Sequence, residues 1–214
     1  MSEISVFTSE LSPFGARVRI AVAARKLDIG FVPPPPERRS PERFSINPLA
    51  KFPVLIDGDK RVVESMAILE YLEDRFDVTP ALRPEDIYHR AIGRSIVSAF
   101  DSAVFPLLTP IFPQLLTPNP DVAIVSTALQ AAMQSWREVA GLFGAKGLVH
   151  GSVLTLADCA MAPFVTLTAV LAHRFELPPP ILAGDRLHDW AAAIAEIQVC
   201  QDAAERIRAT FARL

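Results

Sequence analysis

The chain has few of the residues that several common chemistries need. It contains two cysteines, Cys159 and Cys200, among 214 residues. It has no C-x-x-C, H-E-x-x-H, Walker or G-x-G-x-x-G pattern, so the sequence predicts no metal, ATP or nicotinamide site. A net charge of only −3 leaves no electrostatic footprint for nucleic acid. Both cysteines lie in helical patterns, which favours buried side chains in a reducing cytoplasm over a disulfide.

Long uncharged runs are also scarce. The run 102–120 is interrupted by five prolines, and the run 159–172 is only 14 residues long. A helix that crosses a bilayer needs roughly 20 apolar residues, so we expect neither run to span a membrane. The residues after Met1 lead into a strand-like segment without the basic region and apolar core of a secretory signal. The sequence therefore predicts a cytoplasmic protein.

The chain is rich in hydrophobic residues, which make up 50% of the total. This is enough to fill the core of one large domain or of two small ones. The first part predicts strand, helix, strand, short helix, hairpin and helix in that order, which is compatible with a thioredoxin-like α/β domain at 1–78. Residues 79–86 carry Thr79-Pro80 and Arg83-Pro84 without apolar periodicity and predict a linker. Beyond it, 87–214 predicts an all-helical domain.

Local signals mark several helix starts. Ser12-Pro13 and Ser40-Pro41 combine an N-cap residue with a proline at the first helical position, and Asp121 is a further N-cap candidate. Thr155 and Asp158 form a variant capping box with Asp in place of Glu. In the first helix we expect a stripe of small apolar residues to face the core while four basic residues face water; these are Arg17, Arg19, Arg25 and Lys26. The five prolines of 106–120 predict an irregular apolar loop.

The most informative stretch is 47–72. Phe52-Pro53 precedes an apolar run, and an X-Pro bond adopts the cis form at modest cost. Asp57-Gly58 between two apolar runs predicts a hairpin, whose turn type the sequence leaves open. Ser65 is the expected N-cap of the next helix. A helix N-terminus has unpaired N–H groups and a partial positive charge, so it is a suitable seat for a carboxylate.

The ordered string N-P-L-A-K-F-P-V-L-I-D-G, a short spacer and E-S-M-A-I-L-E-Y-L resembles the glutathione-binding half of soluble glutathione transferases. In that family the residue before the cis-proline pairs with the cysteinyl part of glutathione, and the acid-Ser pair holds its γ-glutamyl end. The resemblance thus implies glutathione as co-substrate, with five binding residues: Lys51, Phe52, Pro53, Glu64 and Ser65. Without that string, Glu64-Ser65 alone indicates a routine helix start.

Ser12 lies where thioredoxin-like proteins place the first cysteine of C-x-x-C, so dithiol chemistry is excluded there. The resemblance implies that the Ser12 hydroxyl donates to the glutathione thiolate, which makes this a serine-type, bacterial or zeta-like member. Ser9 is the competing serine, and a pure capping role for Ser12 stays open. Phe14 stands where maleylacetoacetate isomerases carry a cysteine, which argues against assigning the chain to those isomerases. A hydrolase role for Ser12 is disfavoured, because the G-x-S-x-G pattern and a nearby histidine are both missing.

The resemblance implies a detoxifying transferase that joins the glutathione thiolate to a hydrophobic electrophile, working as a homodimer. A glutathione-dependent isomerase or lyase and a non-catalytic ligand-binding or interaction module are the alternatives. We expect the electrophile to approach from the helical domain. The predicted pocket residues, which interdomain core would explain about equally well, are Phe14, Phe100, Val104, Leu107 and Leu108.

Overall fold

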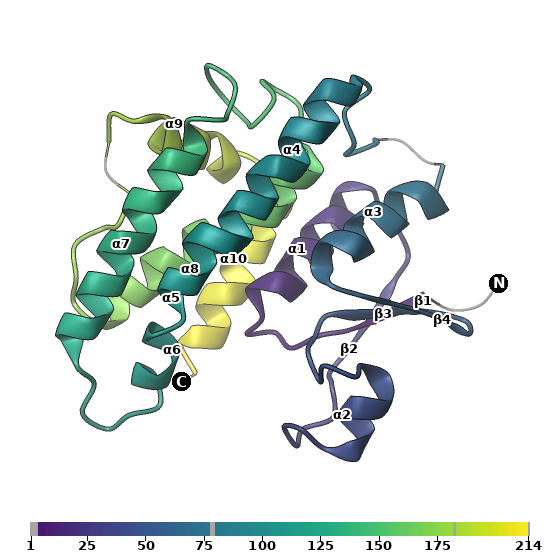
Figure 1. Cartoon of the computed structure of the whole chain (residues 1–214), viewed down its shortest axis with the longest axis horizontal. Helices are drawn as coiled ribbons and strands as arrows, with labels where there is room; N and C mark the ends of the chain where they lie inside the picture. Colours follow the sequence, from purple (N-terminus) through teal and green to yellow (C-terminus); the bar gives the residue numbers. More distant parts are fainter. Residues whose placement is uncertain (1–3, 78–79, 182, 214) are drawn as a thin grey trace.

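A computed structural model describes residues 4–77, 80–181 and 183–213. Its sheet consists of β1 (Ile4–Phe7), β2 (Gly30–Val32), β3 (Val54–Asp57) and β4 (Lys60–Val63), in the order β2-β1-β3-β4. Strand β2 is parallel to β1, whereas β3 pairs antiparallel with both β1 and β4. Three helices belong to this part: α1 (Pro13–Ala24), α2 (Pro41–Ile46) and α3 (Ser65–Arg75). Helices α1 and α3 cover one face of the sheet and α2 lies on the other side (Figure 1). The thioredoxin-like prediction is confirmed.

The rest of the chain is helical, as predicted. It comprises α4 (Ile87–Ala99), the π-helix η1 (Phe100–Val104), α5 (Phe105–Leu108), α6 (Ile111–Gln114), α7 (Val122–Ala140), α8 (Leu156–Arg174), α9 (Arg186–Ala195) and α10 (Gln198–Phe211). Helix α1 packs against α8 and α10, which joins the sheet-bearing part to the helical bundle (Figure 1). The predicted linker 79–86 falls between α3 and α4, and its residue 79 lies outside the described residues.

The loop predicted over the prolines is wrong for its first half. Helix α4 continues through η1 into α5, a turn at 109–110 leads to α6, and 115–121 lacks helix. Pro106 is the second residue of α5. Helix α5 lies directly after the π-helix, and prolines and π-helical turns are both places where a helix bends. The prolines therefore divide this region into short helices without abolishing them.

The expectation that the four basic residues in and just after the first helix face water is wrong for two of them. Arg17 and Arg25 are 0% and 3% exposed. Arg25 donates to the carbonyl oxygens of Leu72 and Phe76 at the end of α3, at 2.6 and 2.5 Å. It also forms an ion pair with the buried side chain of Glu73. A charged group is buried only when it is paired and hydrogen-bonded, and α3 supplies these partners.

Two helical segments meet the length and composition of a membrane span, Ile87–Gln114 and Leu156–Arg174. The apolar window of the second is 78% buried inside the molecule, as in the core helix of a folded domain, whereas that of the first is 33% buried. Helix α8 supplies Phe164 to the core, where the ring lies edge-on to Phe100, which in turn contacts Trp136. Cys159 and Cys200 are buried and free, as predicted.

Candidate functional site

Ser12 is the N-cap of α1. Its backbone is extended, and its Oγ accepts a hydrogen bond from the backbone N–H of Gly15 at 3.2 Å. A hydroxyl that accepts in this way still has its own proton to donate. Ser9 is exposed on the preceding turn, where its Oγ accepts from the N–H of Leu11 at 3.2 Å. Of the two serines, Ser12 lies at the positive end of a helix and therefore in front of its dipole.

Gly15 allows α1 to begin so close to the end of β1. A Cβ atom at this position would lie 1.9 Å from Oγ1 of Thr8 and 3.0 Å from its Cβ. Thr8 is 2% exposed and follows directly after β1, so it has no room to withdraw. The close approach of strand and helix fixes the turn that carries Ser12.

The loop before β3 is organised by Asn47, which is 1% exposed. Its side-chain amide donates to the carbonyl oxygen of Lys51 at 2.7 Å, and its Oδ1 accepts from the N–H of Leu49 at 2.9 Å. These bonds leave the Lys51 side chain exposed, directly before the cis peptide bond of Phe52-Pro53. Sequence reasoning missed the role of Asn47, although Asn is a residue that hydrogen-bonds its own turn.

The start of α3 differs from the prediction. Ser65 is the first helical residue and Glu64 is the N-cap, so the expected cap at Ser65 is wrong by one position. Glu64 has φ 68° and ψ 123°, makes no side-chain cap bond and is exposed. A non-glycine residue in such a conformation is strained, and observed strain of this kind is concentrated at binding sites.

Arg17 connects the two predicted halves of the site. It stands five residues after Ser12 on α1, and its Nη1 donates to Ser65 Oγ at 3.3 Å. The guanidinium forms a bidentate pair with Asp101, with Nη1 to Oδ2 at 2.9 Å, and Nε donates to the carbonyl of Ala160 at 2.6 Å. One buried cation therefore holds α1, α3, η1 and α8 together. Because Ser65 accepts from Arg17, its own proton is free for a ligand.

Asp101 could have been recognised from the sequence, because it is the only charged residue between Ser95 and Pro120. A lone charge in an apolar run predicts a partner. It lies in the π-helix, an irregularity that occurs often at functional sites.

The predicted pocket residues fall into two groups. Phe100, Val104 and Leu108 have 0% exposure and are part of the core. Phe14 and Leu107 are partly buried. The Phe14 ring lies edge-on to Phe105 at 4.7 Å, with the Arg17 guanidinium 4.6 Å from its centroid.

The predicted capping box is present. Asp158 Oδ2 accepts two hydrogen bonds from Thr155, one from its N–H at 2.9 Å and one from its hydroxyl at 2.7 Å. Asp158 Oδ1 accepts from the Val149 N–H and from Trp190 Nε1, each at 2.9 Å. Burial raises the pKa of this carboxyl, and the four donors oppose that shift. These contacts join α8 to α9 and to the preceding loop, which is a structural role.

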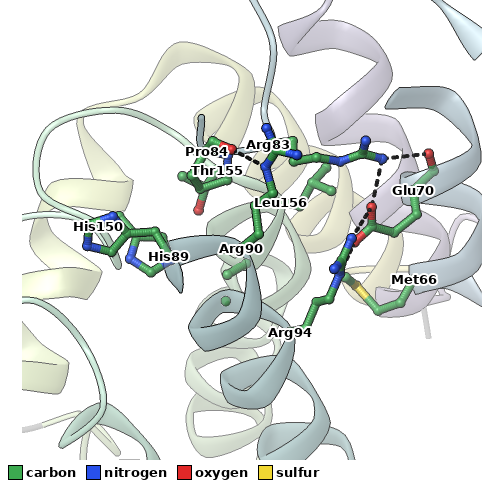
Figure 2. Close-up of a pocket in the computed structure, with 12 residues that line it drawn as sticks. Met66, Glu70, Arg83, Pro84, His89, Arg90, Arg94, His150, Thr155 and Leu156 are labelled. Carbon is green, nitrogen blue, oxygen red and sulfur yellow. Dashed lines mark hydrogen bonds and ion pairs between the residues drawn. The ribbon is translucent and has the colours of Figure 1, made fainter. Parts of the chain in front are cut away.

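Two hollows lie away from Ser12. The one drawn in Figure 2 has a volume of about 20 Å³, lies between Glu70 of α3, Arg94 of α4 and the start of α8, and has room for a water molecule only. The second is a groove of about 510 Å³ between α3 and α4, with Met66, Ala67 and Asp101 among its lining residues. Within the described residues, no group of three potential metal ligands was found.

Comparison with known proteins shows what the chain is similar to. Residues 6–81 match the family described as glutathione S-transferase, N-terminal domain. The first part of the chain is thus similar to the N-terminal domain of glutathione S-transferases. A zeta-class glutathione S-transferase of Euphorbia esula is 38% identical over 94 residues, which are 42% of this chain and 41% of the relative. A glutathione S-transferase of Triticum aestivum is 28% identical over 186 residues, 84% of each chain.

The glutathione S-transferase fold extends over the whole chain. A rice glutathione transferase solved in complex with glutathione has a TM-score of 0.76 and 24% identity, covering 100% of this chain and 97% of its own. The chain spans between 41% and 48% of the first three curated relatives that it matches. The residues that match the family model, 6–81, include Ser12 and Ser65.

Proposed function

We propose that this protein is a glutathione S-transferase that joins the thiolate of glutathione to hydrophobic electrophiles, with the Ser12 hydroxyl donating a hydrogen bond to the thiolate. The observation that carries the proposal is the geometry of Ser12. Its oxygen accepts a hydrogen bond from the N–H of Gly15. Among the described residues, the structure records no acceptor for the Ser12 hydroxyl proton. An anion in front of α1 would receive that proton.

The size of the effect can be bounded. A hydrogen bond to a charged acceptor contributes about 1.5–3 kcal/mol. Since one pKa unit corresponds to about 1.36 kcal/mol, Ser12 lowers the thiol pKa by about one to two units from about 8.5. The dipole of α1 adds to this. The bound thiol is then substantially ionised near neutral pH.

The glutathione tripeptide is proposed to extend from Ser12 along the loop before β3 to the start of α3. The backbone of Phe52, next to Pro53, binds the cysteinyl part, Lys51 lies near the glycyl carboxylate, and Glu64 with Ser65 holds the γ-glutamyl end. The contact between Arg17 and Ser65 supports this arrangement, because it fixes the acceptor side of the Ser65 hydroxyl.

The electrophile is proposed to meet the thiolate beside Phe14 and Leu107, the two predicted pocket residues that keep exposed area. Phe105 and Phe112 are partly buried neighbours, with ring centroids 6.2 Å apart. A wall of this kind has few directed donors, so it would discriminate among electrophiles by about 1–3 kcal/mol per misplaced group.

The assembly is proposed to be a homodimer formed through the groove between α3 and α4. The helical segment Ile87–Gln114 is apolar yet only 33% buried in its apolar window, which leaves an uncovered surface beside the groove. An Ala67→Glu change would convert the dimer to a monomer. The molar mass would be measured by light scattering during size-exclusion chromatography. An unchanged mass would place the interface elsewhere.

The same proposal includes three further properties: the serine-type, bacterial or zeta-like subtype, the cytoplasmic location and the detoxifying role.

The test of the function compares Ser12→Ala with Ser9→Ala in the conjugation of glutathione to an aryl halide at pH 7. We expect Ser12→Ala to lower turnover about tenfold or more and to leave glutathione affinity nearly unchanged, because the hydroxyl acts on the thiolate. Loss in Ser9→Ala alone would move the role to Ser9.

The alternatives make different predictions. A non-catalytic module would retain glutathione affinity in calorimetry and show no conjugation in the unaltered protein. A glutathione-dependent isomerase or lyase would turn over its substrate without consuming glutathione. Phe14, in the place of a cysteine, argues against the maleylacetoacetate isomerase form of that alternative.

A further inference from the structure

Four aromatic rings form one cluster that runs from the start of α1 into the helical part of the chain. The ring of Phe14 lies edge-on to Phe105 of α5 and to Phe164 of α8, with centroids 4.7 and 5.5 Å away. Phe112 of α6 lies 6.2 Å from Phe105. Phe164 is fully buried, whereas the other three rings are only partly buried. Phe105 is therefore a ring of the helical part that contacts Phe14 directly and keeps accessible area.

The cluster lies on the side of α1 that faces Ser65. The guanidinium of Arg17 lies 4.6 Å from the centroid of Phe14, and its Nη1 donates to Ser65 Oγ at 3.3 Å. Phe14 and Arg17 are three residues apart, so they share one face of the helix. Direct contacts thus connect the Phe105 ring, through Phe14 and Arg17, to the residue proposed to hold the γ-glutamyl end of glutathione.

The π-helix η1 gives the Phe105 side chain this direction. The N–H of Phe105 donates to the carbonyl oxygen of Phe100, five residues earlier. In an α-helix, five residues turn the chain by about 500°, so side chains five apart point about 140° away from each other. Here Phe100 and Phe105 both contact the Phe164 ring, at 4.8 and 5.8 Å. The wider i→i+5 turn therefore brings residue 105 to the side that faces α8 and α1.

An accessible aromatic ring distinguishes flat groups from aliphatic ones. Two rings prefer offset-stacked or edge-on arrangements with centroids about 4.5–7 Å apart, and such a pair gains affinity beyond the area that it buries. An alkyl chain of similar size gains only the burial of its apolar area. A ring beside the bound sulfur would therefore favour an aromatic group over an alkyl group by about two- to tenfold in affinity.

We infer that Phe105 is a specificity-determining residue, which selects flat aromatic electrophiles over aliphatic ones by stacking against the aromatic group of the substrate. The inference rests on the proposed function. It deepens that function because it names the class of electrophile and assigns the selection to one side chain, whose direction the π-helix sets.

Calorimetric titration with two glutathione conjugates tests the inference without requiring turnover. S-benzylglutathione has a ring on the sulfur, and S-hexylglutathione has a flexible alkyl chain of similar size. We expect Phe105→Leu to lower the ratio of the benzyl to the hexyl affinity by about two- to tenfold, because leucine is apolar but has no ring. Phe105→Tyr keeps the ring and should leave the ratio nearly unchanged.

The ratio of kcat/KM for benzyl bromide to that for 1-bromohexane should fall in parallel in Phe105→Leu. In both reactions the thiolate sulfur forms a bond to carbon, and bromide leaves with the electron pair of the C–Br bond. The aromatic or alkyl group therefore stays on the sulfur, as it does in the two conjugates.

Phe44→Leu is the matched control. Phe44 is exposed on α2, which lies on the other side of the sheet from α1 (Figure 1). We expect both ratios to stay unchanged in this variant. Thermal unfolding followed by circular dichroism checks the fold of each variant. Phe105→Met, which retains more of the length of the side chain, replaces Phe105→Leu in the comparison if the leucine variant is unfolded.

The outcomes separate selection from packing. An unchanged ratio in the folded leucine or methionine variant, or an equal loss for both conjugates, would mean that the ring only packs, and the inference is wrong. A tyrosine variant that loses the preference as fully as the leucine variant would overturn stacking as its cause. Conjugates that bind with the expected ratios while neither bromide is turned over contradict the proposed function and leave the role of Phe105 intact. A protein that binds neither conjugate overturns both.

Discussion

Replacing Arg17 by methionine should be the most damaging single change near the site. Methionine keeps much of the aliphatic length but removes the guanidinium. The change deletes the bonds to Asp101, to the Ala160 carbonyl and to Ser65 Oγ in one step. Three acceptors then lose their donor, and one of them is a carboxylate.

The magnitude follows from burial. Removing one partner of a buried ion pair costs about 3–5 kcal/mol. The side chain of Asp101 is 34% exposed, so water can take over part of its solvation. We therefore expect a loss of about 3 kcal/mol, the low end of that range. For a protein of this size, about 2–4 °C per kcal/mol converts this loss into a fall in Tm of about 6–12 °C.

Urea unfolding of Arg17→Met, followed by circular dichroism, would measure the loss, and calorimetric titration with glutathione would measure the effect on the site. Arg208→Met provides the matched control, because Arg208 is exposed on α10 and the same substitution there should change stability by less than about 0.5 kcal/mol. A variant at Arg17 that unfolds within about 1 kcal/mol of the parent and binds glutathione fully would refute the network as the link between α1 and α3.

Three smaller experiments test the surrounding packing. Gly15→Ala should cost about 1–3 kcal/mol and lower turnover, because the new Cβ would lie 1.9 Å from Thr8 Oγ1; unaltered stability would mean that the turn yields easily. Cys159 and Cys200 should resist a thiol reagent at pH 8 until the protein unfolds, since burial raises the pKa of Cys159 well above its usual value and that of Cys200 to about 12. Prompt labelling of the native protein would contradict this. Leu107→Ala should change the ranking of electrophiles without changing glutathione affinity, and an unchanged ranking would remove Leu107 from the pocket.

Features that a few neighbouring residues determine were predictable from the sequence. The caps at Ser12, Ser40 and Asp121 accept the expected backbone bonds, and Asp158 accepts from Thr155 as a capping box requires. Each involves partners within three residues, so the local order of residue types carries the information. The hairpin of β3 and β4 has the same local origin.

Features that depend on distant partners were not predictable in this way. Arg17 lies next to an apolar stripe of α1, and by periodicity alone it belongs to the solvent face. Its partners Ser65, Asp101 and Ala160 are 48, 84 and 143 residues away in sequence. No window of a single helix contains them. The same reasoning applies to Arg25, whose partners lie at the end of α3.

The hydrogen bonds of Arg17 cross the boundary of the matched family domain. Ser12 and Ser65 lie within the matched residues 6–81, whereas Asp101 and Ala160 lie beyond them. Arg17 joins the two parts, because its guanidinium bonds Ser65 on one side and both helical-domain acceptors on the other. Any displacement of η1 or α8 would therefore reach the Ser65 hydroxyl through a single side chain. The helical bundle, which supplies the proposed electrophile wall, is in this way mechanically connected to the residue proposed to hold glutathione.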